Sequence, residues 1–241
     1  MSLSPNSDIG DEHYGTDAEF RPGGRPRPLM ICTVLRSGGD YDARYVAALR
    51  RQVEQFAPAE PWGWRVHTDM LDGAVALTQG WPGWWSKMEV FAPVDSDRLY
   101  LDLDTLVVGP LQPLVDAARA AARFVCLRDF YRPDGYGTGL MWLPAGWGAH
   151  VYNKFRGQAA AMMQRFGGDQ NLLEAAVPHA ALWQDIAPGR VVSYKPLPIP
   201  GAFLAAAPAG ASVICFHGRP RPHELAPDNW AARLWRGETA A

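Results

Sequence analysis

The hydrophobic residues of this chain occur in short blocks, and the spacing inside each block predicts its secondary structure. Residues 29–35 (LMICTVL) are continuously apolar, which is typical of a strand buried on both faces. Residues 43–56 carry apolar side chains at helical spacing, and Asp42 stands where a helix N-cap is expected. Residues 62–69 predict a second strand. This β-α-β order predicts a parallel sheet with a right-handed crossover.

The same alternation continues along the chain. The later blocks predict strands at 97–103, 123–130 and 137–144 and in the segments 189–200 and 211–225, and helices at 84–93, 148–166 and 169–177. Strands alternating with helices favour an α/β fold with an open, doubly wound, mostly parallel sheet that has helices on both faces. We expect one domain over 29–241, preceded by a flexible leader over 1–28, which is polar and ends in RPGGRPRP.

Composition narrows the function classes. Apolar residues make up 48% of the 241 residues, so the chain can bury a sizeable core. A formal net charge of −2 argues against general nucleic-acid binding. The three cysteines lack metal-type spacing and fit a reducing compartment. Because we find neither a signal peptide nor an apolar run long enough to span a bilayer, we expect no transmembrane segment and a cytoplasmic protein, either free or peripheral to a membrane.

The apolar run 98–111 (RLYLDLDTLVVGPL) contains two carboxylates two residues apart, Asp102 and Asp104. Residues i and i+2 of a strand share a face, so the two groups would repel each other without a cation nearby. In open α/β sheets, ligands bind at the carboxyl ends of the strands. The pair therefore predicts a site for Mn²⁺ or Mg²⁺ bound to a diphosphate. The alternative is that Asp104 caps the following turn and that Asp102 is simply exposed.

A second polar group follows the late apolar strand ASVICF. It consists of His217 and Gly218, followed by Arg219 and Arg221. Neutral imidazole is a good ligand for Mn²⁺, glycine lets a ligand approach the backbone closely, and guanidinium groups suit phosphate. The alternative is an ordinary basic turn at the surface.

Five segments together resemble the GT-A-fold glycosyltransferases, in particular family 8. They are DRLYLDLDTLVVGPLQPL with its D-x-D motif, GGDQNLL, VICFHGRPRPHE, VLRSGGDYDARYVAALRRQV and GWWSKMEVF. They span residue 29 to about residue 224 in the order found in that family. The resemblance implies a GT-A fold and a metal-dependent enzyme. Its reaction would move a sugar from a nucleotide-sugar, a UDP-sugar, to an acceptor hydroxyl with retention of configuration.

The resemblance also implies roles for individual residues. Asp169 and Gln170 would lie against the reacting sugar as catalytic residues, and Thr138 and Gly139 would border it. The residues expected to contact the nucleotide-sugar are Thr33, Leu35, Arg36, Lys87, Asp102, Leu103, Thr138, Gly139, Gly218, Arg219 and Arg221. Two of these residues have an alternative, purely structural role. Asp169 would be the N-cap of the following helix, and Lys87 would be a solvated helix lysine.

The third metal ligand is open between two residues. In gap-free register the histidine of the family falls on Cys215, three residues before Gly218, whereas the histidine here is His217. Both side chains would lie on one face of the strand. A hard cation prefers imidazole to thiolate, so we expect the metal ligands to be Asp102, Asp104 and His217.

Other functions remain open at this point. The tryptophans at 81, 84, 85 and 142 either line a sugar or acceptor surface or belong to the core. A sugar-phosphate nucleotidyltransferase would also use such a sheet. Such an enzyme would be expected to carry a lysine in the loop after the first strand, and the loop RSGGDYD has none. A non-catalytic module that binds nucleotides or sugars is the second alternative. The acceptor is a glycan, a lipid-linked sugar or a protein, and the sequence does not distinguish among them.

Overall fold

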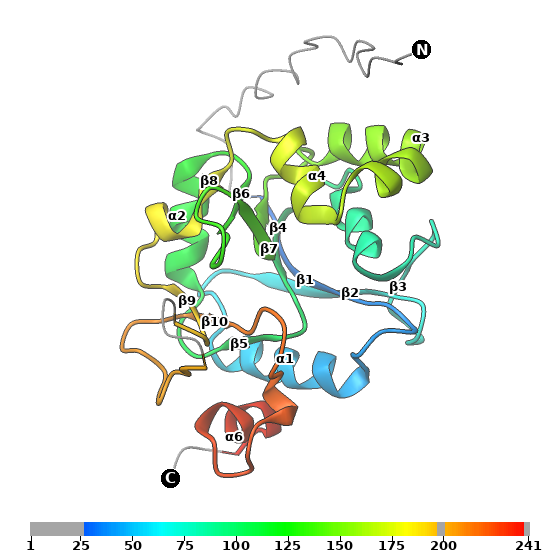
Figure 1. Cartoon of the computed structure of the whole chain (residues 1–241). Helices are drawn as coiled ribbons and strands as arrows, with labels where there is room; N and C mark the ends of the chain where they lie inside the picture. The colour runs from blue at the N-terminus through cyan, green and yellow to red at the C-terminus, as the bar shows by residue number, and fades with distance from the viewer. Residues whose placement is uncertain (1–26, 197–200, 239–241) are drawn as a thin grey trace, which may run out of the picture.

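The central element is a seven-stranded sheet with the order β3-β2-β1-β4-β7-β6-β8. It is seen in a computed structural model that describes residues 27–196 and 201–238 (Figure 1). The strands are β1 (Leu29–Leu35), β2 (Trp62–Thr68), β3 (Val75–Ala76), β4 (Asp97–Leu101), β6 (Val125–Arg128), β7 (Tyr136–Leu143) and β8 (Ala181–Leu182). Only β7 runs antiparallel to its neighbours, β4 and β6, so the sheet is mostly parallel as predicted.

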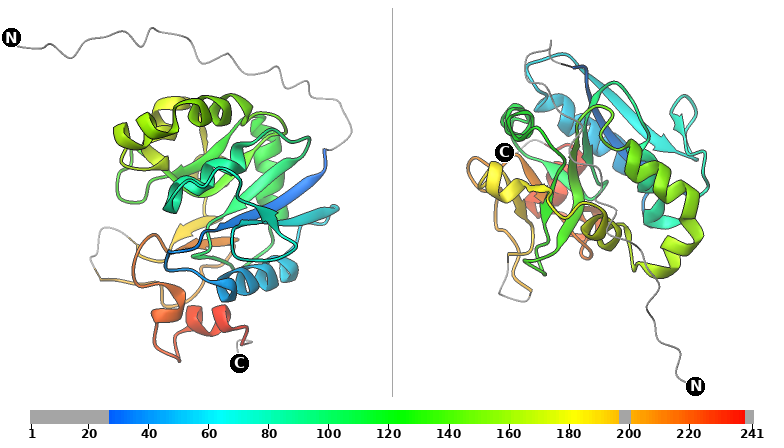
Figure 2. Two further views of the ribbon diagram at one scale, coloured as in Figure 1. Left: turned by 90° about the vertical axis from the view of Figure 1, so that its right-hand side faces the viewer. Right: turned by 90° about the horizontal axis from the view of Figure 1, so that it is seen from above.

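Helices cover both faces of this sheet. One face packs against α1 (Ala43–Gln55), α2 (Gln112–Ala121) and α5 (Trp183–Ile186). The opposite face packs against η1 (Gly83–Phe91), α3 (Ala149–Arg165) and α4 (Asp169–Ala176). Figure 2 shows α3 and α4 on one side of the strands and α1 on the other. The predicted doubly wound α/β architecture is confirmed.

Residue alternation in the strands explains why the sheet needs two helical layers. In β1, Ile31 and Leu35 point into one core, whereas Cys32 points into the other, and all three are fully buried. Successive side chains of a strand face opposite sides, so a continuously apolar strand must be covered twice. The predicted cap of α1 is also present, because the Asp42 carboxylate accepts a hydrogen bond from the Arg44 backbone N–H at 2.9 Å.

The acidic run differs from its prediction. The central strand β4 ends at Leu101, and a new strand, β5 (Thr105–Val107), starts in a second sheet, where it pairs with β10 (Val213–Cys215). The expectation that Asp102 and Asp104 share one face of a single strand is therefore wrong. They lie in a turn, in which the backbone N–H and the hydroxyl of Thr105 donate to the Asp102 carbonyl at 3.1 and 2.7 Å. A continuous apolar run does not reveal that the chain changes sheets here.

The second sheet forms a smaller core beside the first. Its order is β5-β10-β9, with β9 (Val191–Ser193) parallel to β10. The 3₁₀ helix η2 (Pro222–Glu224) and helix α6 (Trp230–Arg236) complete the C-terminal region. Apolar side chains of α6 pack onto this sheet and form its hydrophobic core.

Three remaining predictions concern local details. The helix predicted at 84–93 is the 3₁₀ helix η1, which stops at Phe91, before Pro93. Residues 1–26 of the predicted leader lie outside the described residues, and the division into a leader and one domain stays a prediction. Within the described ranges, no helix is both long enough and apolar enough to span a bilayer.

Candidate functional site

Segments that are far apart in the sequence meet around the D-x-D turn at the carboxyl ends of β1 and β4. Side-chain contacts join the loop after β1, the helix η1, the turn itself, strand β7, the start of α4 and the segment after β10. This is the edge at which open α/β sheets bind ligands. The contacts fall into two groups, one around each aspartate of the motif.

The first group, the Lys87 network, consists of Lys87, Tyr100, Asp102, Thr138 and Asp169. The Lys87 ammonium lies 3.0 Å from Asp102 Oδ1, 3.1 Å from Asp169 Oδ2 and 3.1 Å from Thr138 Oγ1. The Thr138 hydroxyl donates to Asp169 Oδ2 at 2.7 Å, and the Tyr100 hydroxyl donates to Asp102 Oδ1 at 2.5 Å. One cation thus holds two carboxylates that come from a turn and from a helix.

The paired charges of this network outweigh the effect of burial on Lys87. The burial of Lys87 by itself lowers its pKa, but the carboxylates of Asp102 and Asp169 outweigh burial and raise the pKa of Lys87 above its ordinary value. Burial and the Asp102 charge raise the pKa of Tyr100, so its phenol remains a hydrogen-bond donor. The purely structural alternatives for Lys87 and Asp169 are wrong. Lys87 is buried, and the N-cap of α4 is Gly168, not Asp169.

The backbone of Gly139 joins β7 to the D-x-D turn. The Asp102 backbone N–H donates to the Gly139 carbonyl at 2.8 Å, and a side-chain carbon at position 139 would lie 3.5 Å from Asp102 Oδ2. The predicted pair Thr138 and Gly139 is therefore brought to the site together with Asp169. Gln170 follows Asp169 in the first turn of α4 and is partly buried.

The second group, the Arg221 cluster, consists of Asp40, Tyr41, Asp104 and Arg221. The Tyr41 hydroxyl donates to Asp104 Oδ2 at 2.8 Å, and Arg221 Nη1 lies 3.2 Å from the same oxygen. Arg221 also contacts the Tyr41 hydroxyl and donates to Asp40 Oδ2 at 2.9 Å, while its guanidinium carbon lies 4.3 Å from the centroid of the Tyr41 ring. Loops after β1 and β10 thus meet at Asp104.

The two aspartates meet part of the requirements for a divalent cation. Burial, followed by the negative charge of Asp102, raises the pKa of Asp104 to about 7, and the charge of Lys87 opposes this shift. Two carboxylates that repel each other in this way would be stabilised by a cation shared between them. Carboxylate oxygens are the ligands that Mg²⁺ and Mn²⁺ prefer, so the residues of the turn fit such an ion.

The contacts of His217 occupy one ring nitrogen and leave the other, Nδ1, buried without a hydrogen-bond partner. Its Nε2 lies 2.5 Å from Ser193 Oγ, and its ring stacks on Phe130 and meets the edge of Tyr131. Within residues 27–196 and 201–238, no three His, Cys, Asp or Glu side chains are arranged as a metal site. The assignment of His217 therefore stays a prediction.

Cys215, the other candidate for the third ligand, is buried at the end of β10. Burial, followed by the charges of Asp104 and Asp102, raises the pKa of the Cys215 thiol well above its ordinary value. A thiol must lose its proton to bind a metal, and this shift opposes that loss.

The three residues predicted to contact the nucleotide-sugar at the end of β1 differ in burial and in partners. The side chain of Leu35 is buried in the core, and Thr33 is buried with its hydroxyl oxygen unpartnered. Arg36 pairs with Asp69 at 2.7 Å, which ties the end of β1 to the end of β2. Leu103 is buried in the core next to the D-x-D turn. Backbone groups, not the Leu35 and Leu103 side chains, are what these positions offer to a ligand.

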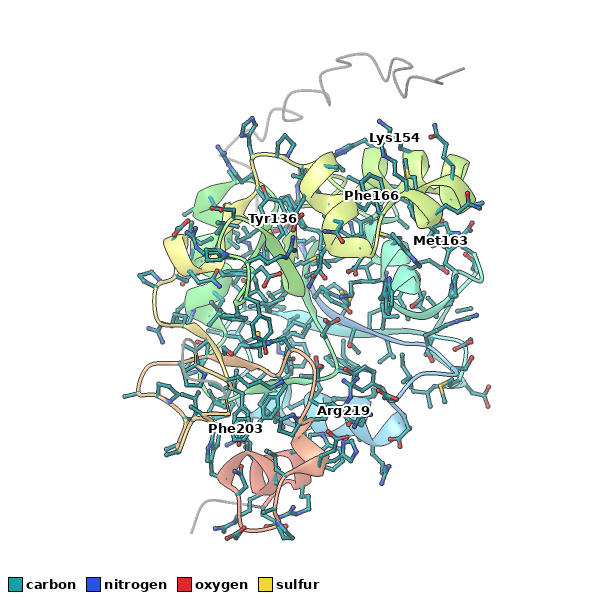
Figure 3. The ribbon with its side chains drawn as sticks, viewed as in Figure 1. Tyr136, Lys154, Met163, Phe166, Phe203 and Arg219 are labelled. Atoms are coloured by element: carbon teal, nitrogen blue, oxygen red, sulfur yellow. The ribbon has the colours of Figure 1, made fainter. Side chains whose placement is uncertain are left out.

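The segment after β10 separates its two arginines. Gly218 has a φ of +78°, a left-handed conformation that favours glycine and turns the chain toward the site. Arg221 is largely buried at the D-x-D turn, with its side chain 14% exposed, whereas the Arg219 side chain is 62% exposed. Arg219 is labelled in Figure 3, where it lies between α1 and the C-terminal helix.

Tyr41 and Tyr100 belong to the candidate site, and the sequence analysis does not name them. Tyr41 lies in the loop between β1 and α1, at the ligand-binding edge, and this place in the chain was an available signal. Tyr100 reads as a core residue of an apolar strand, and only its hydroxyl contact with Asp102 reveals its second role. Both tyrosines hold an aspartate of the D-x-D turn.

Comparisons with solved structures identify the fold. The chain is similar to the galactosyltransferase LgtC in complex with donor and acceptor sugar analogs, with a TM-score of 0.61 and 16% sequence identity over 88% of this chain and 97% of LgtC. It is similar to the glycosyltransferase GlyE of Streptococcus pneumoniae TIGR4, with a TM-score of 0.56 and 10% identity over 90% of this chain and 61% of GlyE.

A third similar structure is the bifunctional glycosyltransferase WbbM, with a TM-score of 0.56 and 9% identity over 89% of this chain and 52% of WbbM. No protein-family model matches the sequence, and no curated protein matches it. The structural likeness defines the fold of the chain, which is the GT-A fold of these glycosyltransferases, as the D-x-D segment predicts.

Proposed function

We propose that this protein is a metal-dependent glycosyltransferase that moves a sugar from a UDP-sugar to an acceptor hydroxyl with retention of configuration. One observation carries the proposal: the Lys87 network and the Arg221 cluster meet at the D-x-D turn, on the ligand-binding edge of a GT-A sheet. The first group suits a sugar, because it combines carboxylate and hydroxyl groups. The second suits a diphosphate, because Arg221 presents planar donors.

The metal in this proposal is Mn²⁺ or Mg²⁺. Asp102 and Asp104 would hold it together with oxygens of the diphosphate, which is the usual coordination of such ions at nucleotide sites. When bound, the ion would stabilise the negative charge that develops on the leaving UDP. Arg221 would shift from Asp104 toward the diphosphate, since a phosphate oxygen is a charge-assisted acceptor of the same kind.

The Lys87 network would orient the transferred sugar. Asp169 is held in place by Lys87 and Thr138, so its carboxylate is fixed beside the D-x-D turn. A fixed carboxylate at this position stabilises positive charge at the anomeric carbon, and the amide of Gln170 would hold a sugar hydroxyl. In a retaining reaction the acceptor attacks on the face that UDP leaves, and a diphosphate oxygen takes its proton.

A UDP-release screen tests this proposal. The purified chain is incubated with a set of UDP-sugars in Mn²⁺, in Mg²⁺ and in EDTA, and the anomeric configuration of any product is read by NMR. We expect metal-dependent UDP release with at least one donor, lost in Asp104→Asn and kept in the exposed control Asp116→Asn.

Two other outcomes of the screen would replace the proposal. Pyrophosphate-dependent cleavage of a UDP-sugar into UTP and a sugar 1-phosphate would identify a nucleotidyltransferase. Metal-dependent UDP binding without turnover of any UDP-sugar, even to water, would identify a non-catalytic binding module.

A further inference from the structure

One tryptophan of the candidate site differs from its neighbours. Of the four tryptophans that raise the question of a sugar surface, Trp81, Trp85 and Trp142 are buried at 7%, 7% and 1% exposure. They belong to the core. Trp84 is 59% exposed. An exposed indole leaves a large apolar surface in water, which is a cost that a bound partner would remove.

Trp84 lies on the side of η1 that carries the site. In a 3₁₀ helix, side chains at i and i+3 are eclipsed, so Trp84 and Lys87 project from the same side of η1. A side-chain carbon at Gly168 would lie 3.5 Å from Trp84 Nε1, so the indole rests next to the residue that precedes Asp169. The Trp84 ring therefore borders the catalytic pair proposed above.

The order of groups across the site indicates which substrate meets this ring. Arg221 contacts Asp104, Lys87 contacts both Asp102 and Asp169, and Trp84 lies beside Gly168, the neighbour of Asp169 in the chain. A donor whose diphosphate lies at Arg221 has its sugar at the Lys87 network. The next group to enter, from the side of Trp84, is the acceptor.

We propose that Trp84 is the platform on which the acceptor stacks and that the acceptor is a carbohydrate ring. This inference rests on the proposed function and deepens it by naming the class of acceptor. A pyranose presents a face of C–H groups that packs on an aromatic ring, and the indole N–H is a donor for a sugar hydroxyl. A serine or threonine side chain of a protein acceptor presents no such face.

Saturation-transfer NMR tests the proposal. Wild-type protein with UDP and Mn²⁺ is mixed in turn with methyl β-D-galactoside, methyl β-D-glucoside, methyl N-acetyl-β-D-glucosaminide and the open-chain control xylitol. We expect saturation transfer to the ring C–H protons of at least one glycoside and none to xylitol. The signal should fall at least fivefold in Trp84→Ala and persist in Trp84→Phe.

The matched control is Phe203→Ala, which removes another exposed aromatic ring. Phe203 is 45% exposed and stacks on Tyr194 beside the second sheet, at the lower left of Figure 3. Its removal should leave the signal at the wild-type level. UDP binding is measured on the same samples and separates the two proposals. If the wild-type protein does not bind UDP, the proposed function itself is overturned. With UDP bound, equal signals in wild type and Trp84→Ala, or no glycoside signal at all, would overturn the acceptor platform alone.

Discussion

The two aspartates of the D-x-D turn lie only two residues apart, yet they belong to different parts of the molecule. Asp102 belongs to the Lys87 network, whose members come from the central sheet and the helices η1 and α4. Asp104 belongs to the Arg221 cluster, whose other members come from loops after β1 and β10. The turn that joins the two sheets therefore also joins a core-supported half of the site to a loop-supported half.

This difference predicts separate roles. In the Lys87 network, Lys87 and Asp169 are buried and their charges are paired within the protein, so breaking it should damage the fold as well as the site. The Arg221 cluster contains Asp40 and is partly exposed, with side-chain exposures of 53% for Asp40 and 14% for Arg221. Breaking it should mainly weaken ligand binding. The experiments below separate the two halves, from the largest expected effect to the smallest.

Removing the positive charge of Lys87 should have the largest effect. Lys87→Met keeps the length of the side chain but leaves two carboxylates, Asp102 and Asp169, without their shared partner. Losing one partner of a buried ion pair typically costs about 3–5 kcal/mol, so we expect a loss of about that size in the free energy of unfolding. Urea unfolding followed by circular dichroism measures it.

An exposed ion pair on α1 supplies the control for Lys87. Arg50 pairs with Glu54 at 2.8 Å, with both side chains more than half exposed. Arg50→Met should cost no more than about 0.5 kcal/mol. If Lys87→Met costs no more than this control, the network is not the stabilising half of the site.

Arg221 gives the next largest effect. Arg221→Ala should weaken UDP binding by roughly 10–100-fold, because charge-assisted hydrogen bonds contribute about 1.5–3 kcal/mol. Uridine, which has no phosphate, should lose little affinity. Isothermal titration calorimetry with both ligands measures the difference, and equal losses for UDP and uridine would mean that Arg221 acts through the structure alone.

Arg219→Ala is the matched control for Arg221, two residues earlier on the same segment. Because its side chain is 62% exposed, we expect a loss of less than about fivefold in UDP affinity. The two arginines are alike in sequence, so only the structure distinguishes their expected effects. A larger loss for Arg219 than for Arg221 would reverse this assignment.

The pH dependence of stability should show the smallest effect. The pKa of Asp104 is raised to about 7 in the folded protein, from an ordinary value of 3.8. Between these values the folded state binds more protons at this site than the unfolded state, so the contribution is present at low pH and is lost as pH rises toward about 7. Contacts with Arg221 and Lys87 favour the charged form, so we expect only about 1–2 kcal/mol.

The difference between wild type and Asp104→Asn isolates this contribution. Unfolding free energies measured in EDTA from pH 4.5 to 7.5 should fall with pH more steeply in the wild type than in the variant. Arg221→Ala should steepen the slope further, because it removes a cation 3.2 Å from Asp104. Parallel pH profiles for wild type and Asp104→Asn would show that Asp104 is not the buried titrating group.

Sequence patterns predicted the elements that depend on local spacing. The strands around Leu29–Leu35 and Tyr136–Leu143, the α1 helix and its Asp42 cap follow from periodicity and capping chemistry. The D-x-D motif also marked the sheet edge at which the segments of the candidate site meet. These features depend on short stretches of chain, within which the physical signal is complete.

The features that the sequence did not predict depend on tertiary contacts. The apolar run across Asp102 and Asp104 looks like one strand, because both sheets bury their part of it completely. The partners of Lys87 are contributed by other segments of the chain, so its spacing gives no sign of burial. His217 was chosen on ligand chemistry, but the packing of its ring against Phe130 and Tyr131 is a property of the fold alone.

The most direct test of the central claim is calorimetric titration of UDP into the wild-type chain in Mn²⁺ and in EDTA, with Asp102→Asn and Asp104→Asn beside it. We predict UDP binding that needs the metal, and a loss of at least tenfold in affinity in each variant. Both variants should keep a cooperative unfolding transition, which excludes misfolding as the cause. UDP binding of equal strength with and without Mn²⁺, unchanged in both variants, would contradict the claim that the D-x-D turn binds a metal and a nucleoside diphosphate.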